Sequence, residues 1–401
     1  MTSPSTSFDA VVVGTGIAGL AAALALARRQ VRVALLGPRA ELPAAVADRY
    51  DPRVYAISPA SRQLLADLGA WGAVPPPRTT TVEAMDVYGD LGARLQLQAW
   101  QAGQADLATI VESTELERAL RNALQVFGVP WHVGRFAGLT RRAGANDVEL
   151  LLDDGERMAC RLAVAADGAQ SPLRHAAGFT THQRDYPATG LVAHLNAELP
   201  HQGSALQWFM PDGVLALLPM PATAAGPQVS MVWSLKRDQA DALRALPEPD
   251  RSQTLETRLA EITQGRLGHL TVRSSLHGFD LQLQQATPLA MRGVALLGDA
   301  AHVVHPLAGQ GLNLGLGDVA ALAQAVGERE SWRQPGDDRV LRRYQRARAE
   351  SLAAMRLATD GLYHLFDVPL PPLAWLRNTG LQWLNHVPLA KRLLIRQASL
   401  F

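Results

Sequence analysis

The residues best suited to chemistry crowd into one stretch, residues 293–323. An acid, Asp299, directly follows an apolar run of the kind that forms a buried strand, and a glycine-rich turn then leads into a helix-like segment from Leu312. A carboxylate accepts hydrogen bonds from sugar hydroxyls, glycines let the backbone approach a ligand, and a helix start offers free N–H groups and partial positive charge. The pattern predicts a site for a polar cofactor whose ring becomes anionic on reduction.

The N-terminal residues form a second glycine-rich turn. A short apolar strand ends where Gly14, Gly16 and Gly19 begin, an alanine-rich helix over residues 20–29 follows, and a second apolar strand completes a βαβ unit. In this setting the glycines permit a tight turn, close approach to a pyrophosphate and close packing of helix on strand. We therefore predict that a dinucleotide binds at this turn.

The position that usually binds the adenosine ribose departs from this pattern. An acid is expected after the second strand, but residues 37–39 read Gly-Pro-Arg and the nearest acid is Glu41. The backbone, Arg39 and Glu41 are therefore the alternatives for holding this sugar.

A third strand–turn–helix pattern lies between the other two in the sequence. Apolar residues 163–166 lead into Asp167 and Gly168, and Pro172 stands at an early position of the helix that follows, where proline is favoured. The pattern predicts a second acidic turn of the type that can serve a cofactor.

These motifs and their order along the chain resemble the group A flavoprotein aromatic hydroxylases, and more narrowly the ubiquinone-biosynthesis hydroxylases among them. The similar stretches are Asp51-Pro52-Arg53, Leu68-Gly69-Ala70-Trp71, Asp167-Gly168, Val232-Trp233-Ser234, and Gly298-Asp299-Ala300-Ala301-His302 with the residues after it as far as Asp318. The resemblance covers nearly the whole chain. It implies FAD as the cofactor and NAD(P)H as a transient co-substrate.

The resemblance also implies roles for individual residues. Asp299 would contact the ribitol of FAD, and the helix after Gly311 would face the pyrimidine edge of the flavin ring. Asp167 and Gly168 would serve FAD and the nicotinamide donor. The full set of candidate cofactor-binding residues is Gly14, Gly16, Gly19, Arg53, Arg118, Asp167, Gly168, Gly298, Asp299, Gly309, Gly311, Leu312 and Asn313.

The activity implied by the resemblance is hydroxylation of the aromatic ring of a polyprenylated phenol in ubiquinone biosynthesis, with NAD(P)H and O2, through a C4a-hydroperoxyflavin. The candidate catalytic residues are Pro306, through its carbonyl, and His305. Two alternatives stay open: a hydroxylase of small soluble aromatic compounds, and a non-catalytic FAD-bound subunit of a biosynthetic assembly. The insoluble substrate suggests delivery by a ubiquinone-biosynthesis complex or at a membrane surface.

The implied fold is α/β: a Rossmann-like FAD domain of the glutathione-reductase type, an antiparallel β-sheet substrate domain and C-terminal helices. The expected ranges are 1–76, 103–182 and 277–360 for a discontinuous FAD-binding domain, 77–102 and 183–276 for the substrate domain, and 361–401 for a C-terminal helical segment. In the substrate domain, Trp208, Phe209, Met220 and Trp233 are interpreted either as sheet core or as walls of an apolar pocket. We expect Arg348 to lie on a solvent-exposed helix face.

Composition excludes several other classes. The net charge of +1 gives no case for electrostatic steering towards nucleic acid or an anionic membrane, and one cysteine, Cys160, excludes an internal disulfide. His302 and His305 stand near Asp299, but no metal is expected, because the glycine-rich setting favours a cofactor. With no secretory signal and no long apolar run, we expect a cytoplasmic protein, possibly peripheral to the inner membrane, whose oligomeric state the sequence leaves open.

Overall fold

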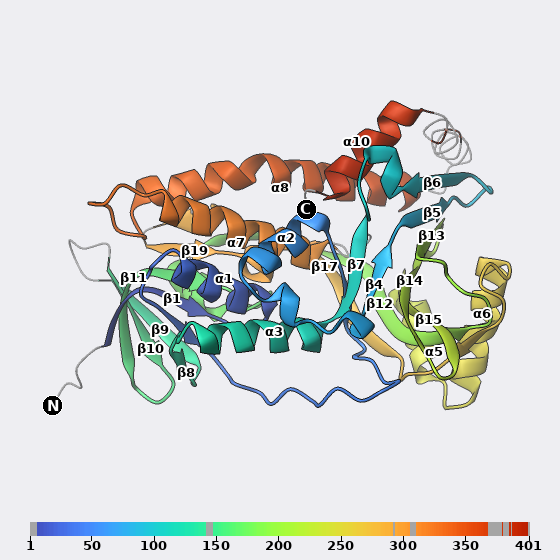
Figure 1. The fold of residues 1–401 in the computed structure, drawn as a ribbon, viewed down its shortest axis with the longest axis horizontal. Helices are drawn as coiled ribbons and strands as arrows, with labels where there is room; N and C mark the ends of the chain where they lie inside the picture. The colour runs from blue at the N-terminus through green and yellow to red at the C-terminus, as the bar shows by residue number, and fades with distance from the viewer. Residues whose placement is uncertain are drawn as a thin grey trace.

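Two large β-sheets lie side by side, and a small third sheet lies between them (Figure 1). The computed structural model describes residues 6–141, 147–291, 293–304, 310–367 and 387–399, together with residues 379 and 385. Two helices, α7 (Gly311–Gly327) and α8 (Asp338–Asp367), run along one side of the molecule. Helix α7 packs against both α8 and the first helix of the chain, α1 (Ile17–Arg28).

The first sheet contains the predicted βαβ unit. Its strands run in the order β18 (Ala290–Met291), β19 (Val294–Leu296), β11 (Arg157–Ala165), β1 (Thr6–Val13), β2 (Val33–Leu36) and β8 (Trp131–His132), and β10 (Val148–Leu152) and β9 (Phe136–Arg141) extend it from β11. Strand β1 is parallel to both β2 and β11. Parallel neighbours need a crossover between them, and α1 (Ile17–Arg28) supplies the one from β1 to β2.

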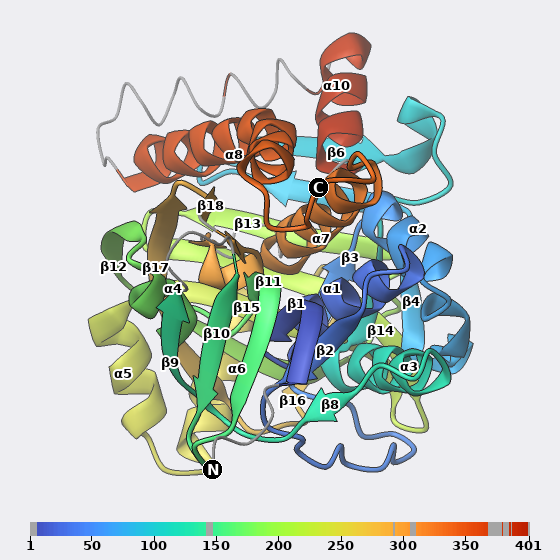
Figure 2. The same ribbon diagram turned by 90° about the vertical axis from the view of Figure 1, so that its left-hand side faces the viewer.

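Helix α1 is buried along most of its length because other elements cover it on several sides. Its alanines and leucines pack in one core with the strands of the first sheet and with α3 (Ser113–Val126) and α7. In Figure 2, α7 and α8 lie above this sheet and α3 lies beside β2. The small side chains of α1 let these helices approach closely, which fixes where the turn before α1 lies.

The second sheet is larger. Its strands run in the order β20 (His302–Val303), β17 (His277–Thr287), β12 (Thr180–Ala197), β15 (Gly226–Lys236), β14 (Gly213–Thr223), β13 (Ser204–Met210), β5 (Ala84–Tyr88) and β6 (Arg94–Gln98), with β16 (Leu270–Val272) paired to β12. Helices α5 (Arg237–Ala245) and α6 (Asp250–Thr263) cover its outer face. This sheet forms the wall opposite the first sheet.

Strand register decides which side chains of the second sheet face outward. Trp208 is paired with Leu215, and Leu215 with Trp233, so all three share one face. They belong to the core that includes Leu243 of α5 and Leu259 of α6. Trp208 and Trp233 are therefore sheet core beneath the helices, and the pocket interpretation is wrong for them. Successive strand residues point to opposite faces, and Phe209 accordingly packs in a separate cluster.

The smaller elements connect the two sheets. The third sheet consists of β3 (Val54–Ile57), β7 (Ala108–Glu112) and β4 (Thr79–Val82), and it shares an apolar cluster with the second sheet. The remaining segments are α2 (Pro59–Asp67), α4 (Pro172–Ala177), α10 (Pro388–Ser399), and the short 3-10 turns η1 (Trp71–Ala73), η2 (Pro76–Arg78), η3 (Ala99–Ala102) and η4 (Gly298–Ala300).

The expected domain ranges differ from the sheet pairing in one place. Strand β17 falls in the range expected for the FAD-binding domain, yet it pairs with β12 in the second sheet. Strands β5 and β6, from the range 77–102, lie at the edge of that same sheet. The division into domains stays a prediction, because β17 belongs to the second sheet while its Ala286 packs in the core of the first.

Candidate active site

Three of the predicted motifs meet at one edge of the first sheet. Strands β1, β11 and β19 are parallel neighbours. Gly14, Asp167 and Asp299 follow the ends of these three strands within three residues. In an open parallel sheet, ligands bind outside the carboxyl ends of the strands. The fold thus brings together turns that lie more than a hundred residues apart in the chain.

The glycines of the first turn have different structural roles. A Cβ built on Gly14, whose φ is +117°, would lie 2.1 Å from the carbonyl oxygen of Ala166, and one on Gly19 would lie 2.0 Å from the carbonyl oxygen of Gly14. Both glycines are required by the packing of α1 against the strand ends. A Cβ on Gly16 would meet no atom within 4 Å. Because no described protein atom occupies the space beside Gly16, this is the glycine that leaves room for a ligand.

Asp299 lies in the turn η4, where its side chain is exposed to solvent. Desolvation by the surrounding protein nevertheless raises the pKa of its carboxyl, while His302 and Arg53 act in the opposite direction. A group that is accessible yet flanked by protein atoms is placed to contact a bound ligand. Its carboxylate accepts no hydrogen bond from the residues the structure describes, so its oxygens are available.

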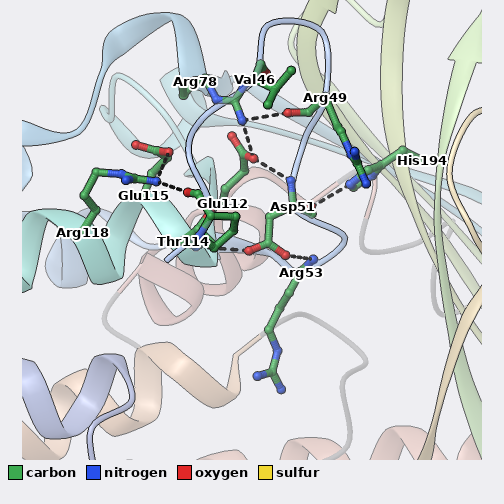
Figure 3. A network of polar contacts seen from close by, with 11 residues as sticks. Val46, Arg49, Asp51, Arg53, Arg78, Glu112, Thr114, Glu115, Arg118 and His194 are labelled. Carbon is green, nitrogen blue, oxygen red and sulfur yellow. Dashed lines mark hydrogen bonds and ion pairs between the residues drawn. The ribbon is translucent and has the colours of Figure 1, made fainter. Parts of the chain in front are cut away.

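Arg53 lies near Asp299 but forms no ion pair with a carboxylate of the described residues. Its guanidinium is 5.9 Å from the ring centre of Tyr55, and its side chain extends away from the polar network that surrounds its backbone (Figure 3). An uncommitted cation beside Asp299 suits an anionic part of a cofactor.

A buried carboxylate, Asp318 of α7, supports the Asp299 turn from behind. It accepts hydrogen bonds from Gly298 N (2.9 Å), His302 Nε2 (2.6 Å) and Arg348 Nε (2.7 Å). Burial raises the pKa of Asp318, but its interactions with His302 and Arg348 outweigh this effect and hold the pKa below its ordinary value. Asp318 therefore stays ionised and fixes the residues on both sides of Asp299.

The expectation for Arg348 was wrong. Instead of facing solvent, the Arg348 side chain is buried, pairs with Asp318 and donates a hydrogen bond to the carbonyl of Leu314 at 3.0 Å. The helix pattern around Arg348 is polar, which predicted exposure. A second signal was present in the sequence, because a buried acid such as Asp318 needs a cationic partner.

The Asp167 side chain is bonded to the start of helix α4 and does not point freely into the site. Its carboxylate accepts hydrogen bonds from Ser171 Oγ (2.5 Å) and Leu173 N (3.1 Å) at the start of α4, and burial raises its pKa. Gly168 follows with a φ of +87°, a conformation that favours glycine. Arg174 then links this turn to the Asp299 turn through the carbonyl of Ala300, at 2.9 Å.

The start of α7 is the remaining part of the site. A Cβ on Gly311 would meet no atom within 4 Å, and Leu312 is half-buried against the core of the first sheet. The side chain of Asn313 is taken by the protein, because its Nδ2 donates to Ala56 O (2.8 Å) and its Oδ1 accepts from Ser58 N (3.0 Å). Asn313 thus ties the helix start to the junction of β3 and α2.

The other sequence-predicted residues fall into two groups. His305, Pro306 and Gly309 lie outside the described residues. Arg118 donates to the carbonyl of Pro43 at 2.8 Å and lies 3.5 Å from Glu115, so its described contacts hold a loop of the protein. Its role toward a cofactor stays a prediction.

Two residues that sequence reasoning missed, the buried Glu112 and the partly buried Arg78, secure the segment before Arg53. Glu112 and Arg78 form an ion pair of 2.7 Å, and Glu112 is 2% exposed. Their only sequence signal is an acid at the end of an apolar strand.

Within the described part of the chain, no group of His, Cys, Asp and Glu side chains could hold a metal ion.

Comparisons with known proteins agree with this geometry. Residues 7–358 match the family model described as FAD binding domain. The chain is 32% identical to ubiquinone hydroxylase UbiL of Rhodospirillum rubrum, over 97% of this chain and 89% of the relative. It is also 32% identical to 3-demethoxyubiquinol 3-hydroxylase of Escherichia coli, over 97% of this chain and 98% of the relative.

Solved structures share the fold. The p-nitrophenol 4-monooxygenase PnpA from Pseudomonas putida superposes with a TM-score of 0.77 at 18% identity, over 98% of this chain and 99% of that one. PqsL of Pseudomonas aeruginosa, titled a probable FAD-dependent monooxygenase, gives 0.75 at 23% identity, over 94% and 99%. These likenesses confirm the predicted α/β fold class.

The family match and the full-length relatives confirm the expected cofactor, FAD, and the expected enzyme type, a FAD-dependent aromatic monooxygenase. The open glycines and the accessible carboxylate at the strand ends fit that cofactor, and so does Arg53, which has no carboxylate partner among the described residues. The chain belongs to the FAD-binding-domain family, as a member of the ubiquinone-biosynthesis hydroxylases among the group A flavoprotein monooxygenases.

Proposed function

We propose that this enzyme hydroxylates the ring of a polyprenylated phenol on the way to ubiquinone, with NAD(P)H and O2 as co-substrates. The observation that carries the substrate class is the full-length similarity to two proteins named ubiquinone hydroxylase and 3-demethoxyubiquinol 3-hydroxylase. When bound, FAD supplies the redox and oxygen-transfer chemistry. The chain itself has to bind the cofactor, orient it and keep water away.

The residues at the strand ends divide the binding work. The open turn at Gly16 and the start of α1 would hold the pyrophosphate, because free N–H groups at a helix start attract anions. The Asp299 carboxylate would accept hydrogen bonds from ribitol hydroxyls. The start of α7, with Gly311 open, would lie against the part of the ring that gains charge on reduction. His305 and Pro306, which lie outside the described residues, stay the candidate catalytic residues.

The function is tested by purifying the protein, recording its visible spectrum and following oxidation of NADH and NADPH with and without a prenylated phenol. A flavin spectrum and substrate-stimulated oxidation that yields a hydroxylated phenol are expected. Turnover of a simple phenol without a prenyl tail would favour the alternative of a small-aromatic hydroxylase. Normal ubiquinone levels in cells whose only copy carries Asp299→Ala would favour the non-catalytic alternative.

The proposal also places the enzyme at an anionic membrane surface, where its substrate would be found. Helix α10 exposes Leu389 (71%) and Leu393 (61%), with Arg392 and Arg396 exposed on the same helix. No acid occurs between Pro388 and Ser399. Apolar and cationic side chains on one helix suit a bilayer interface. Among the described residues, no helix is long and apolar enough to cross a membrane.

Cosedimentation with lipid vesicles tests this surface. Binding to vesicles that contain anionic lipid is expected, with a loss in the Leu389→Asp, Leu393→Asp double variant. Leu199→Asp is the matched control, because Leu199 is a half-exposed leucine in a loop of the second sheet. No binding to any vesicle, combined with copurification of other ubiquinone-biosynthesis proteins, would instead favour delivery by a complex.

A further inference from the structure

One loop residue, Asp51, has all four of its polar atoms in hydrogen bonds with separate parts of the molecule (Figure 3). Its N–H donates to Glu112 Oε2 at 2.6 Å, and its carbonyl is bonded to His194 Nε2 at 2.8 Å. Its carboxylate accepts from Arg53 N at 2.8 Å and from Thr114 N at 3.3 Å. Asp51 is thus fixed by β7, by the start of α3, by β12 and by its own loop.

The partners of Asp51 are themselves held firmly. Glu112 and His194 are 2% and 3% exposed, and buried polar partners of this kind are costly to disturb. Arg78, paired with Glu112, also donates to the carbonyls of Val46 and Arg49, at 3.1 and 3.0 Å. The same ion pair therefore secures the chain before Asp51 and the backbone of Asp51 itself.

Arg53, two residues after Asp51, shows the opposite behaviour. Its backbone N–H is bound by the Asp51 carboxylate, but its guanidinium has no carboxylate partner among the described residues and lies on the Asp299 side. Figure 3 shows the Arg53 side chain extending away from the network. The Arg53 backbone is fixed, and its guanidinium has no ion-pair partner among the described residues. This arrangement is expected of a residue that binds an anionic ligand.

We propose that Asp51 is a positioning residue that sets Arg53 for a phosphate of the bound dinucleotide. This inference rests on the proposed function, because the phosphate belongs to FAD. Fixing the Arg53 backbone in advance removes part of the ordering cost that binding would otherwise carry. Without the Asp51 carboxylate, the loop keeps its Glu112 and His194 contacts, but the backbone N–H groups of Arg53 and Thr114 lose their acceptor.

The test is a double-mutant cycle on FAD binding. Apoprotein is titrated with FAD and the flavin fluorescence followed, for wild type, Asp51→Ala, Arg53→Ala and the double variant. A roughly tenfold loss of affinity is expected for Asp51→Ala, on the scale of ordering one long side chain. The double variant should bind no worse than Arg53→Ala alone, because Asp51 acts through Arg53. Losses that add across the two sites, or no loss in Asp51→Ala, would overturn the proposal.

Two further measurements separate positioning from general damage. Affinity for FAD should fall with ionic strength more steeply in wild type than in Asp51→Ala, since the variant uses the arginine charge less. Asp153→Ala is the matched control: its carboxylate also accepts a loop N–H, that of Arg135 at 3.0 Å, but in a hairpin beyond β10. It should bind FAD like wild type.

Folding is checked by thermal unfolding of each apoprotein, and Asp51→Asn keeps a side-chain oxygen as acceptor should Asp51→Ala unfold. That variant should lie between wild type and Asp51→Ala in affinity. An equal salt dependence in all variants would refute a role through Arg53. A wild-type protein that binds no FAD would fail the proposed function, whereas wild-type binding with unchanged Asp51 variants would fail only this inference.

Discussion

Substituting alanine for Gly16 and for Gly19 should damage the protein in two different ways. The two glycines are three residues apart in the same turn, but a Cβ on Gly19 would lie 2.0 Å from a backbone oxygen, whereas a Cβ on Gly16 would meet nothing within 4 Å. Gly19→Ala should therefore destabilise the apoprotein. Gly16→Ala should leave the apoprotein folded and weaken FAD binding.

The magnitudes follow from these distances. Overpacking costs about 1–3 kcal/mol, and the upper part applies to Gly19 because the obstructing atom belongs to the backbone and cannot rotate aside. Alanine returns up to about 1 kcal/mol of helix propensity, which leaves a net loss of about 2 kcal/mol for Gly19→Ala. For Gly16→Ala the same 1–3 kcal/mol falls on the ligand, and this corresponds to roughly a 5- to 150-fold weaker FAD affinity.

Urea unfolding of apoprotein and fluorescence titration with FAD separate the two effects. Gly72→Ala is the matched control, because Gly72 also has open space around it and an ordinary φ but lies outside the site. It should change neither quantity. If Gly16→Ala, or the bulkier Gly16→Val, retained wild-type FAD affinity, the assignment of the pyrophosphate to this turn would be refuted. A Gly19→Ala protein as stable as wild type would refute the packing argument.

Three other substitutions or treatments have definite expected outcomes. Asp318→Asn should lower the free energy of unfolding by about 3–5 kcal/mol, because it leaves the buried Arg348 guanidinium without a counter-charge; Glu248→Gln, in an exposed ion pair, is the control and should have little effect. The pKa of the Asp318 carboxyl is lowered on folding. Its contribution to the free energy of unfolding is therefore fully present above the pKa of the unfolded chain, 3.8, and is lost as the pH falls through the lower pKa of the folded protein. The difference between wild type and Asp318→Asn in urea unfolding should therefore narrow as the pH falls below 3.8. Asp299→Asn should weaken FAD binding in a fluorescence titration without lowering the melting temperature of the apoprotein, because the carboxylate bonds to no described residue and its desolvation costs stability. Burial raises the pKa of Cys160 to about 12, so iodoacetamide at pH about 8 should label this thiol only after unfolding, as mass spectrometry would show.

Sequence reasoning succeeded where the signal is local. The turns at Gly14, Asp167 and Asp299 were each predicted from a strand, a turn and a helix that are consecutive in the chain. Parallel strands then bring such turns to one edge, which is a general property of the fold. The outline of a dinucleotide site was accessible for this reason, whereas FAD itself was implied by the family resemblance.

Contacts between distant residues were not accessible in the same way. Arg348 and Asp318 are 30 positions apart, and Arg78 and Glu112 are 34 apart, and nothing in either segment names its partner. The faces of Trp208 and Trp233 were also undetermined. Both sides of the second sheet are covered, so its strands lack the alternation of polar and apolar residues that would reveal which face is outward.

The continuity of β12 and β17 has a mechanical consequence. The two strands pair from Thr180 with Thr287, beside the first sheet, to Val192 with His277, inside the second. No linker joins the two sheets at this point; they are joined by a two-stranded ribbon whose register shifts only between Asp185 and Thr189. Swinging one sheet away from the other would require that ribbon to bend or twist at this irregularity. We therefore expect the two sheets to move little relative to each other. Access to the flavin should depend on loops that move over them.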